Sequence, residues 1–218
     1  MNREWSELNK EMQKLISRKC TFSEGVSALC GLREQLMKVM LGFGDELSRE
    51  DLCAAPFVNA DGYHSKTIAY SLWHIFRIED IVAHTLIKGD EQVFFSGGYK
   101  ERTRSPIITT GNELVKQEIA EFSEKLDIDA LYAYITEVKE STEDIVRSLD
   151  FGDLKRRVSP DQREKLESLG VVSRDESAVW LIDYWCGKDV LGLIKMPFSR
   201  HWIMHTEACL RIQAGLKK

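Results

Sequence analysis

The sequence predicts an all-α protein, and three observations support this class. Over most of the 218 residues, apolar side chains recur at intervals of three and four, which is the period of one face of an α-helix. Strand patterns are nearly absent, because Ile107-Ile108 and Val171-Val172 are too short and lack alternating partners. An apolar content of 43%, with only four Pro and 14 Gly, is typical of a globular chain rather than a disordered or collagen-like one.

The N-terminal part of the chain predicts two amphipathic helices. Apolar side chains from Trp5 to Ile16 follow the helical period and predict a helix over residues 2–19, which we interpret as an addition to the core. The same period predicts a long helix over residues 23–48 that ends before Pro56.

A third long helix is predicted over residues 65–87, after a turn at Asn59–Gly62. Residues 88–111 are rich in Gly and predict a crossover loop. This loop is either a functional lid or a structural connection anchored by Phe94 and Phe95.

Two further helices are predicted before residue 150. The capping-box pattern Thr110-x-x-Glu113 is expected to open a short helix that reaches residue 124. Apolar spacing then predicts a helix over residues 129–149, which Asp127 or Asp129 can cap.

The last third of the chain predicts three more helices. Ser159-Pro160 starts a short one that Gly170 stops, and the capping box Ser173-x-x-Glu176 leads into a mostly buried helix around residues 179–185. Pro197 is expected to break the chain, and Ser199 to cap a final helix over residues 199–214. The whole chain, residues 1–218, is expected to form one helical-bundle domain.

Charge and cysteine content limit the classes of partner. Thirty Lys plus Arg against 35 Asp plus Glu give a net charge of -5, so we expect no nucleic-acid partner. The five Cys are odd in number and irregularly spaced, without a CxxC motif, which indicates reduced thiols and a cytoplasmic protein. The N-terminus lacks the pattern of a signal peptide, and charges interrupt even the apolar stretch 179–196, so we expect no membrane partner.

Histidine spacing points to a metal site. His201 and His205 lie four residues apart on one face of the last predicted helix and could chelate one ion. A single HxxxH is weak evidence, and a third histidine on a facing helix would strengthen it. His74 lies in an apolar run and is the candidate, the alternative being a core histidine with a satisfied hydrogen bond. Three imidazoles with open positions are typical of catalytic metal sites.

Two segments resemble motifs of one known family. Residues 71–80, SLWHIFRIED, look like the second-helix motif of the DinB-like (YfiT-like) superfamily, in which a His within an apolar run is followed by an acidic residue. Residues 199–207, SRHWIMHTE, are similar to the HxxxH of that family's last helix. The order of the elements also agrees, and the resemblance covers roughly residues 23–215.

The resemblance implies a four-helix bundle in an up-down-down-up arrangement. It also implies that His74, His201 and His205 bind one divalent metal ion, most commonly zinc or nickel, with iron or manganese as alternatives. Two parts depart from the family pattern: an additional N-terminal helix within residues 1–20, and short helices inserted over residues 150–198 before the last core helix. These additions could reshape the pocket or support a homodimer.

The resemblance further implies an enzyme. Superfamily members with an assigned activity include thiol-dependent S-transferases and isomerases, so we expect transfer of a low-molecular-weight thiol to a small electrophilic substrate. Metal-dependent hydrolysis is an alternative. An enzyme requires a cavity of roughly a few hundred cubic ångströms beside the ion.

Two non-catalytic alternatives make different structural predictions. A stress-related metal- or ligand-binding bundle would have a closed coordination shell and no pocket. An interaction module in which His74 only packs would leave the three imidazoles apart.

Several neighbouring residues have two interpretations. Cys209 continues the face of His201 and His205, and is either a fourth ligand or a small apolar residue. Tyr70 either presents its hydroxyl to the site or is a core tyrosine with its tip at the rim.

Three other residues are expected to lie outside the ligand set. His84 lies about 80° around the helix from His74, and Glu79 about 140°, although Glu79 could orient a neighbouring element. His64 lies near the turn and is expected to be solvated or to cap the helix.

Overall fold

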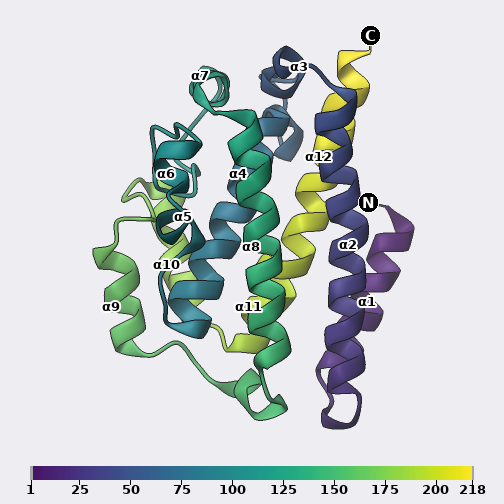
Figure 1. Cartoon of the computed structure of the whole chain (residues 1–218), viewed down its shortest axis with the longest axis vertical. Helices are drawn as coiled ribbons and strands as arrows, with labels where there is room; N and C mark the ends of the chain where they lie inside the picture. The colour runs from purple at the N-terminus through teal and green to yellow at the C-terminus, as the bar shows by residue number, and fades with distance from the viewer. Residues whose placement is uncertain (1, 218) are drawn as a thin grey trace.

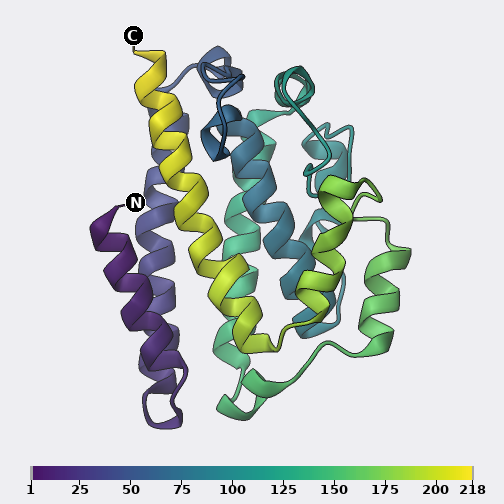
Figure 2. The same ribbon diagram turned by 180° about the vertical axis from the view of Figure 1, so that it is seen from behind.

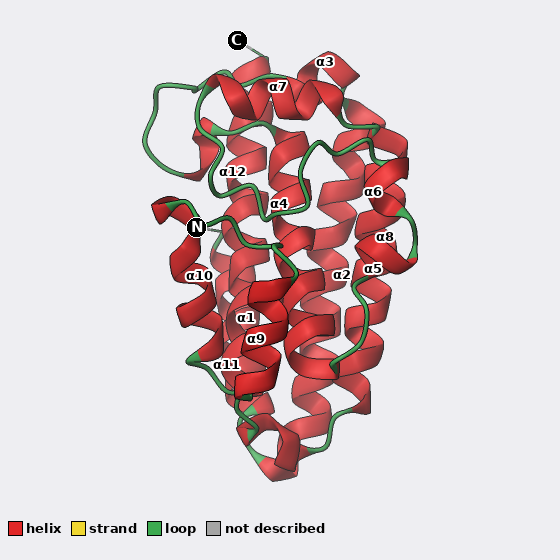
Figure 3. Ribbon diagram, turned by 90° about the vertical axis from the view of Figure 1, so that its left-hand side faces the viewer, coloured by secondary structure: helices red, strands yellow, loops and turns green. Residues whose placement is uncertain are grey.

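The computed structural model describes residues 2–217, and the regular elements in that range are all helical (Figure 3). The expectation of an all-α protein is therefore confirmed. Within the described range, no helix combines the length and apolar character needed to cross a bilayer. The helices are α1 (Arg3–Ile16), α2 (Phe22–Glu46), α3 (Arg49–Cys53), α4 (Ile68–Asp80), α5 (Val93–Ser96), α6 (Tyr99–Arg102), α7 (Gln117–Lys125), α8 (Ile128–Ser148), α9 (Pro160–Ser168), α10 (Glu176–Cys186), α11 (Val190–Lys195) and α12 (His201–Leu216).

The four long helices α2, α4, α8 and α12 pack against one another (Figure 1). Helix α1 lies along the outer side of α2, whereas α9 and α10 lie at the opposite side of the molecule, as the reverse view in Figure 2 also shows. The N-terminal addition and the segment before α12 therefore cover different flanks of the long helices.

Two clusters of buried apolar side chains form the interior. One lies among the long helices and is rich in edge-to-face aromatic contacts, such as those of Trp73 with Phe94 and Phe122 at ring-centroid distances of 5.3 and 5.5 Å. The other joins side chains of α1, the end of the α4 segment, and α9 to α11, including Met12, Leu166 and Trp185. Both additions to the core thus gain stability by burying apolar surface against it.

Most long helices begin and end close to the predicted residues. Helices α1, α2 and α8 match the expected ranges 2–19, 23–48 and 129–149 to within three residues at each end. Asp127, rather than Asp129, caps α8 by accepting a hydrogen bond from the Ala130 N–H. The capping box that begins α9 at Ser159-Pro160 is confirmed, and Gly170 beyond its end adopts a left-handed φ of 63°.

Two predicted capping boxes are wrong. Thr110 does not start a helix, because its hydroxyl donates to Asn112 and Gly111 turns the chain with a φ of 76°; α7 begins only at Gln117. Ser173 accepts a hydrogen bond from the Asp175 N–H, and Asp175 itself caps α10. In both cases the side chain forms its hydrogen bond within a turn that precedes the helix, so it cannot cap the helix.

The predicted helix over residues 65–87 changes geometry along its length. Its α-helical part begins at Ile68 after Thr67, whose hydroxyl accepts from the Tyr70 N–H. From Ile81 to Lys88 the chain continues as a π-helix, which ends at Gly89 with a φ of 84°. The wider π turn cannot be seen in the spacing of apolar residues, because that spacing stays close to the α-helical period.

The predicted break at Pro197 is wrong. A π-helical turn, Met196–Arg200, joins α11 to α12, with Pro197 near its first position, where the missing N–H costs little. Ser199 does not cap α12, since its hydroxyl donates to the Lys195 carbonyl. The last helix is therefore continuous with the helical end of the inserted segment.

The helix predicted around residues 179–185 is not mostly buried. In α10, Leu181 and Trp185 face the interior, whereas Val179 and Trp180 are 41% and 50% exposed. The helix is amphipathic, and the exposed Trp180 lines a cavity.

The crossover loop is firmly attached to the core. It contains the short helices α5 and α6, and Phe94 is fully buried. The Asp80 carboxylate accepts hydrogen bonds from the Val93 and Phe94 N–H groups at 2.8 and 2.9 Å. These contacts favour the structural connection over the lid.

Two glycines of α2 provide a matched test of the packing of α1. A Cβ at Gly25 would lie 2.3 Å from the backbone nitrogen of Ile16, whereas a Cβ at Gly31 would meet nothing within 4 Å. We expect Gly25→Ala to destabilise the protein by about 1–3 kcal/mol through overpacking, and Gly31→Ala to stabilise it by up to ~1 kcal/mol through helix propensity. Urea unfolding of both variants checks this, and equal effects would contradict the close α1–α2 contact.

Candidate metal centre

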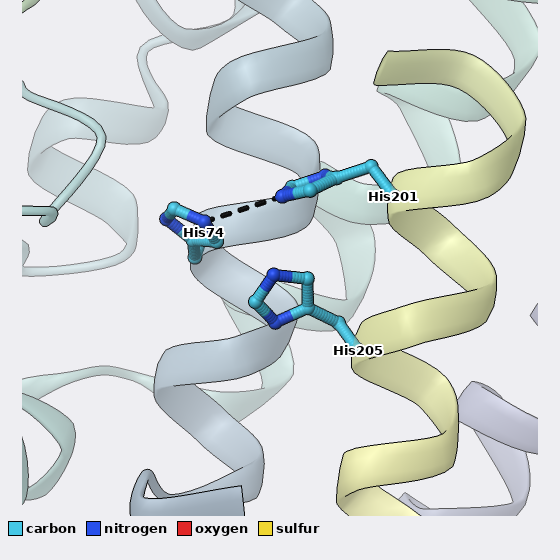
Figure 4. Close-up of side chains that lie close together, drawn as sticks. All are labelled: His74, His201 and His205. Carbon is cyan, nitrogen blue, oxygen red and sulfur yellow. Dashed lines mark hydrogen bonds between the residues drawn. The ribbon is translucent and has the colours of Figure 1, made fainter. Parts of the chain in front are cut away.

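Three histidines from two helices converge in the interior. His74 comes from α4, and His201 and His205 from successive turns of α12, with their rings turned towards one another (Figure 4). One ring nitrogen of each lies within 4.8 Å of those of the other two, and the ring centroids are 4.4 to 5.1 Å apart. All three residues are buried. This convergence contradicts the expectation of the interaction-module hypothesis, in which His74 only packs.

Hydrogen bonds leave several ring nitrogens available. The Nδ1–H of His74 donates to the Thr110 carbonyl at 2.8 Å, because a carbonyl can only accept, and this tautomer leaves a lone pair on Nε2. That Nε2 atom is 3.3 Å from Nε2 of His201. Nδ1 of His201 and both nitrogens of His205 are buried and have no hydrogen-bond partner among residues 2–217.

These orphaned nitrogens fit a metal ion. Buried polar atoms normally have a partner, so the unsatisfied ring nitrogens of His201 and His205 need an explanation. Neutral imidazole is a common ligand for first-row divalent metals, and a backbone carbonyl that orients a liganding histidine is a usual supporting contact. The three residues and the Thr110 carbonyl have the composition of such a site.

Burial keeps the three imidazoles neutral. It lowers the pKa of His74 from 6.5 to about 4, and the charge of Lys66 adds to this effect. The pKa values of His201 and His205 are lowered well below the usual range, mainly by burial and then by the neighbouring histidines. Because a metal ligand must be deprotonated, the cluster is ready to bind a cation at neutral pH.

A buried ion pair fixes α12 beside α4. Arg33 of α2 donates two hydrogen bonds to the carboxylate of Glu79, at 2.7 and 2.8 Å, and both side chains are almost fully buried. The indole Nε1–H of Trp202 donates to the same carboxylate at 2.7 Å, and the guanidinium of Arg33 lies 4.2 Å from the centroid of that ring. Since Trp202 directly follows His201, this contact fixes the rotation of α12 about its axis. The imidazoles of His201 and His205 are thereby directed towards His74.

The role of Glu79 was predictable from the sequence, whereas that of Arg33 was not predicted. Glu79 does not join the histidines, and it orients a neighbouring helix as expected. Arg33 lies among Leu29, Leu32 and Leu36 on the buried face of α2. The position of this arginine within an apolar stripe could have indicated a buried ion pair, because a fully buried arginine needs an acidic partner.

A cavity of about 230 Å³ adjoins the cluster. Besides the three histidines, its walls contain side chains from the turn before α4, from α4 itself, from the segment before α7 and from the inserted segment. They are Tyr63, Ile78, Asn112, Trp180, Leu181, Tyr184, Trp185, Met196 and Pro197. The segment between α8 and α12 therefore forms much of the pocket, as the length of the insertion suggested.

Other candidate residues lie outside the cluster. Cys209 is fully buried, its pKa is raised to about 12 by burial, and it is not among the groups close enough to share an ion in the described chain. Tyr70 is a core tyrosine that stacks on His74, with its hydroxyl donating to the Gly111 carbonyl. The remaining two histidines do not contribute: His84 contacts Asp90 and Ser141, and His64 packs against Phe57.

No family model matches the chain, and no curated protein matches it. The assignment of a family and an activity therefore depends on the residues themselves.

The buried ion pair can be tested by removing one charge. We expect Glu79→Gln to destabilise the protein by about 3–5 kcal/mol, because the buried Arg33 would lose its two-point carboxylate partner and keep only the single carboxylate contact with Glu143 at 3.2 Å. The control is Lys10→Gln, which breaks an exposed pair with Glu7 and should cost at most about 1 kcal/mol. Urea unfolding measures both, and a Glu79→Gln cost as small as the control would contradict the assigned role.

The lowered pKa of His74 predicts a pH-dependent stability. The unfolded chain takes up a proton below pH 6.5, whereas folded His74 stays neutral to about pH 4, so stability falls as the pH falls through this window. With chelator present, His74→Gln should lose about 2 kcal/mol less than wild type between pH 7 and pH 5. His64→Gln, outside the cluster, serves as control and should keep the wild-type loss. Identical losses in the wild type and His74→Gln would refute this prediction.

Proposed function

We propose that the protein is a divalent-metal-dependent enzyme of the DinB-like type that transfers a low-molecular-weight thiol to a small electrophilic substrate. The observation that carries this proposal is the set of three convergent, neutral histidines with orphaned nitrogens at the wall of a cavity. A site of this kind combines metal ligands with room for a substrate.

The course of the chain supports a four-helix bundle of this family. In Figure 1, α2 and α12 run upwards from their N-terminal ends, whereas α4 and α8 run downwards. This order fits the up-down-down-up arrangement that the two sequence motifs imply. His74 on the second of these helices and the His201/His205 pair on the last occupy the motif positions.

The chain's own residues would hold the ion and bind the substrate. His74, His201 and His205 are the proposed ligands, zinc or nickel the expected metals, with iron or manganese as alternatives. A divalent ion at this point would stabilise a thiolate or polarise a carbonyl oxygen. The Thr110 carbonyl holds His74 in one tautomer, and the aromatic side chains of α10 form an apolar part of the cavity wall.

The composition of the cavity favours a nucleophile from the cosubstrate. Among the described residues, its lining has no serine, cysteine or carboxylate that could attack the substrate or act as a general base. The buried thiol of Cys209, with a raised pKa, is a poor nucleophile. A thiol cosubstrate would supply this group itself.

Two alternatives make different predictions about the same site. A hydrolase would act on the electrophile without added thiol. A non-catalytic metal-binding bundle would show a closed coordination shell, and the cavity beside the histidines argues against it.

The test combines metal content with turnover. Protein purified without an affinity tag should contain about one divalent ion per chain, and His201→Ala should lose it, whereas His64→Ala should retain it. With a panel of cellular thiols and a chromogenic aryl electrophile, we expect turnover by the metal-loaded wild type and a loss of at least about 100-fold in His201→Ala.

Each negative result has a distinct meaning. Metal-free wild-type protein would refute the metal site. Bound metal with hydrolysis of the electrophile in the absence of thiol would replace the transferase by a hydrolase. Bound metal with no turnover would favour the non-catalytic bundle.

A further inference from the structure

We infer that the cavity beside the histidines takes a small aromatic ligand carrying an anionic group, with the rings of α10 binding the aromatic part and Lys66 attracting the negative charge. The inference rests on the proposed function in treating this cavity as the substrate site. Three independent features lead to it: the aromatic wall, the position of Lys66, and the size of the cavity.

Aromatic side chains from two segments line the cavity. Trp180 and Tyr184 of α10 lie edge to face with centroids 5.7 Å apart, and Trp185 is buried behind them. Across the site, the ring of Tyr63 lies 4.8 Å from that of His205. Trp180 and Tyr63 are 50% and 48% exposed, so two large rings at the cavity remain in contact with water. Such rings favour a flat, apolar ligand that would cover them.

Lys66 is not part of the cavity lining, but its positive charge lies against the ring of Tyr70, which stacks on one of the proposed ligands. Its ammonium group lies 5.5 Å from the centroid of Tyr70, and Tyr70 stacks on His74 with centroids 5.6 Å apart. The charge of Lys66 lowers the pKa of both His74 and His205, so its field reaches the cluster.

No described carboxylate compensates this charge. Lys66 is half-buried, burial is the one resolved influence on its pKa, and it forms no ion pair within residues 2–217. The nearby Glu113 raises the pKa of Tyr70 and accepts a hydrogen bond from Thr109, but has no resolved effect on Lys66. A partly desolvated cation without a partner attracts an anion, and the neutral histidines do not compete for it.

The size of the cavity limits the ligand. A dry cavity of ~150 Å³ lined by apolar side chains holds benzene. A cavity of about 230 Å³ therefore has room for one substituted ring with a short acidic side chain, and the amide of Asn112 in its lining can donate to that acid.

Two nearly isosteric probes test the charge preference. Phenylacetate and 2-phenylacetamide differ in charge but hardly in shape, and their binding can be measured by calorimetry in chelator-treated and in zinc-loaded protein. We expect the wild type to prefer phenylacetate by roughly tenfold, equivalent to about 1.4 kcal/mol, in both forms. Lys66→Met should abolish this preference, while Trp180→Ala should weaken both probes equally.

The control is Lys38→Met, which removes an exposed lysine on α2 and should leave the preference unchanged. Thermal unfolding of each variant verifies that it is folded. Equal binding of the two probes by the wild type, or a preference that survives Lys66→Met, would overturn the inference. A preference seen only in the zinc-loaded form would also overturn it, because the ion alone would then select the anion.

The outcome is separable from that of the proposed function. Metal content and thiol transfer are measured without these probes, so loss of the transferase proposal leaves the charge preference standing. Conversely, failure of the Lys66→Met test leaves metal binding and transfer untouched.

Discussion

The buried pair of Arg33 and Glu79 is the constraint on which the site depends. Removing two charges from water is costly, and the pair is tolerated because the carboxylate is matched by two guanidinium hydrogen bonds and by the Trp202 indole. Arg33 also donates to the Phe198 carbonyl, just before α12. One set of contacts therefore joins α2, α4 and the start of the last helix.

This geometry explains why the histidines meet. Apolar packing alone permits a helix to rotate or slide by small amounts, whereas a buried carboxylate accepts only a few orientations of its donors. Trp202 lies between His201 and His205 in the sequence, so the contact that satisfies Glu79 also directs the two imidazoles towards His74. Stability and the candidate metal centre are thus coupled through one indole.

The helices and the His201/His205 pair were predictable from the sequence because both follow the helical period, whereas His74 was a candidate because of its apolar run and the resemblance of its segment to a known motif. Leu29, Leu32 and Leu36 indicate a buried face of α2, and the spacing of His201 and His205 indicates a shared face of α12. The sequence did not predict which hydrogen bonds the side chains of Thr110 and Ser173 form. Both residues match capping boxes, but their hydroxyls form hydrogen bonds within turns that precede the helices. Pro197 failed as a signal because a π turn accommodates it.

Contacts between residues far apart in the chain could not be predicted from the spacing of residue types either. Nothing near Lys66 indicates that it lies close to His74 and His205, since the relation depends on how the turn before α4 folds back. The wall supplied by Trp180 and Tyr184 depends in the same way on how the inserted segment packs.

The division of the pocket between core and insertion has an evolutionary consequence. The candidate metal ligands belong to α4 and α12, whose packing the buried ion pair constrains, whereas the aromatic wall belongs to α10, outside the group of four long helices. Substitutions at the exposed positions of α10, such as Val179 and Trp180, can therefore accumulate at little cost to folding or to the geometry of the histidines, whereas the buried Leu181 and Trp185 are constrained. Descendants of this chain could therefore reshape the pocket by changing the insertion while inheriting an unaltered histidine cluster.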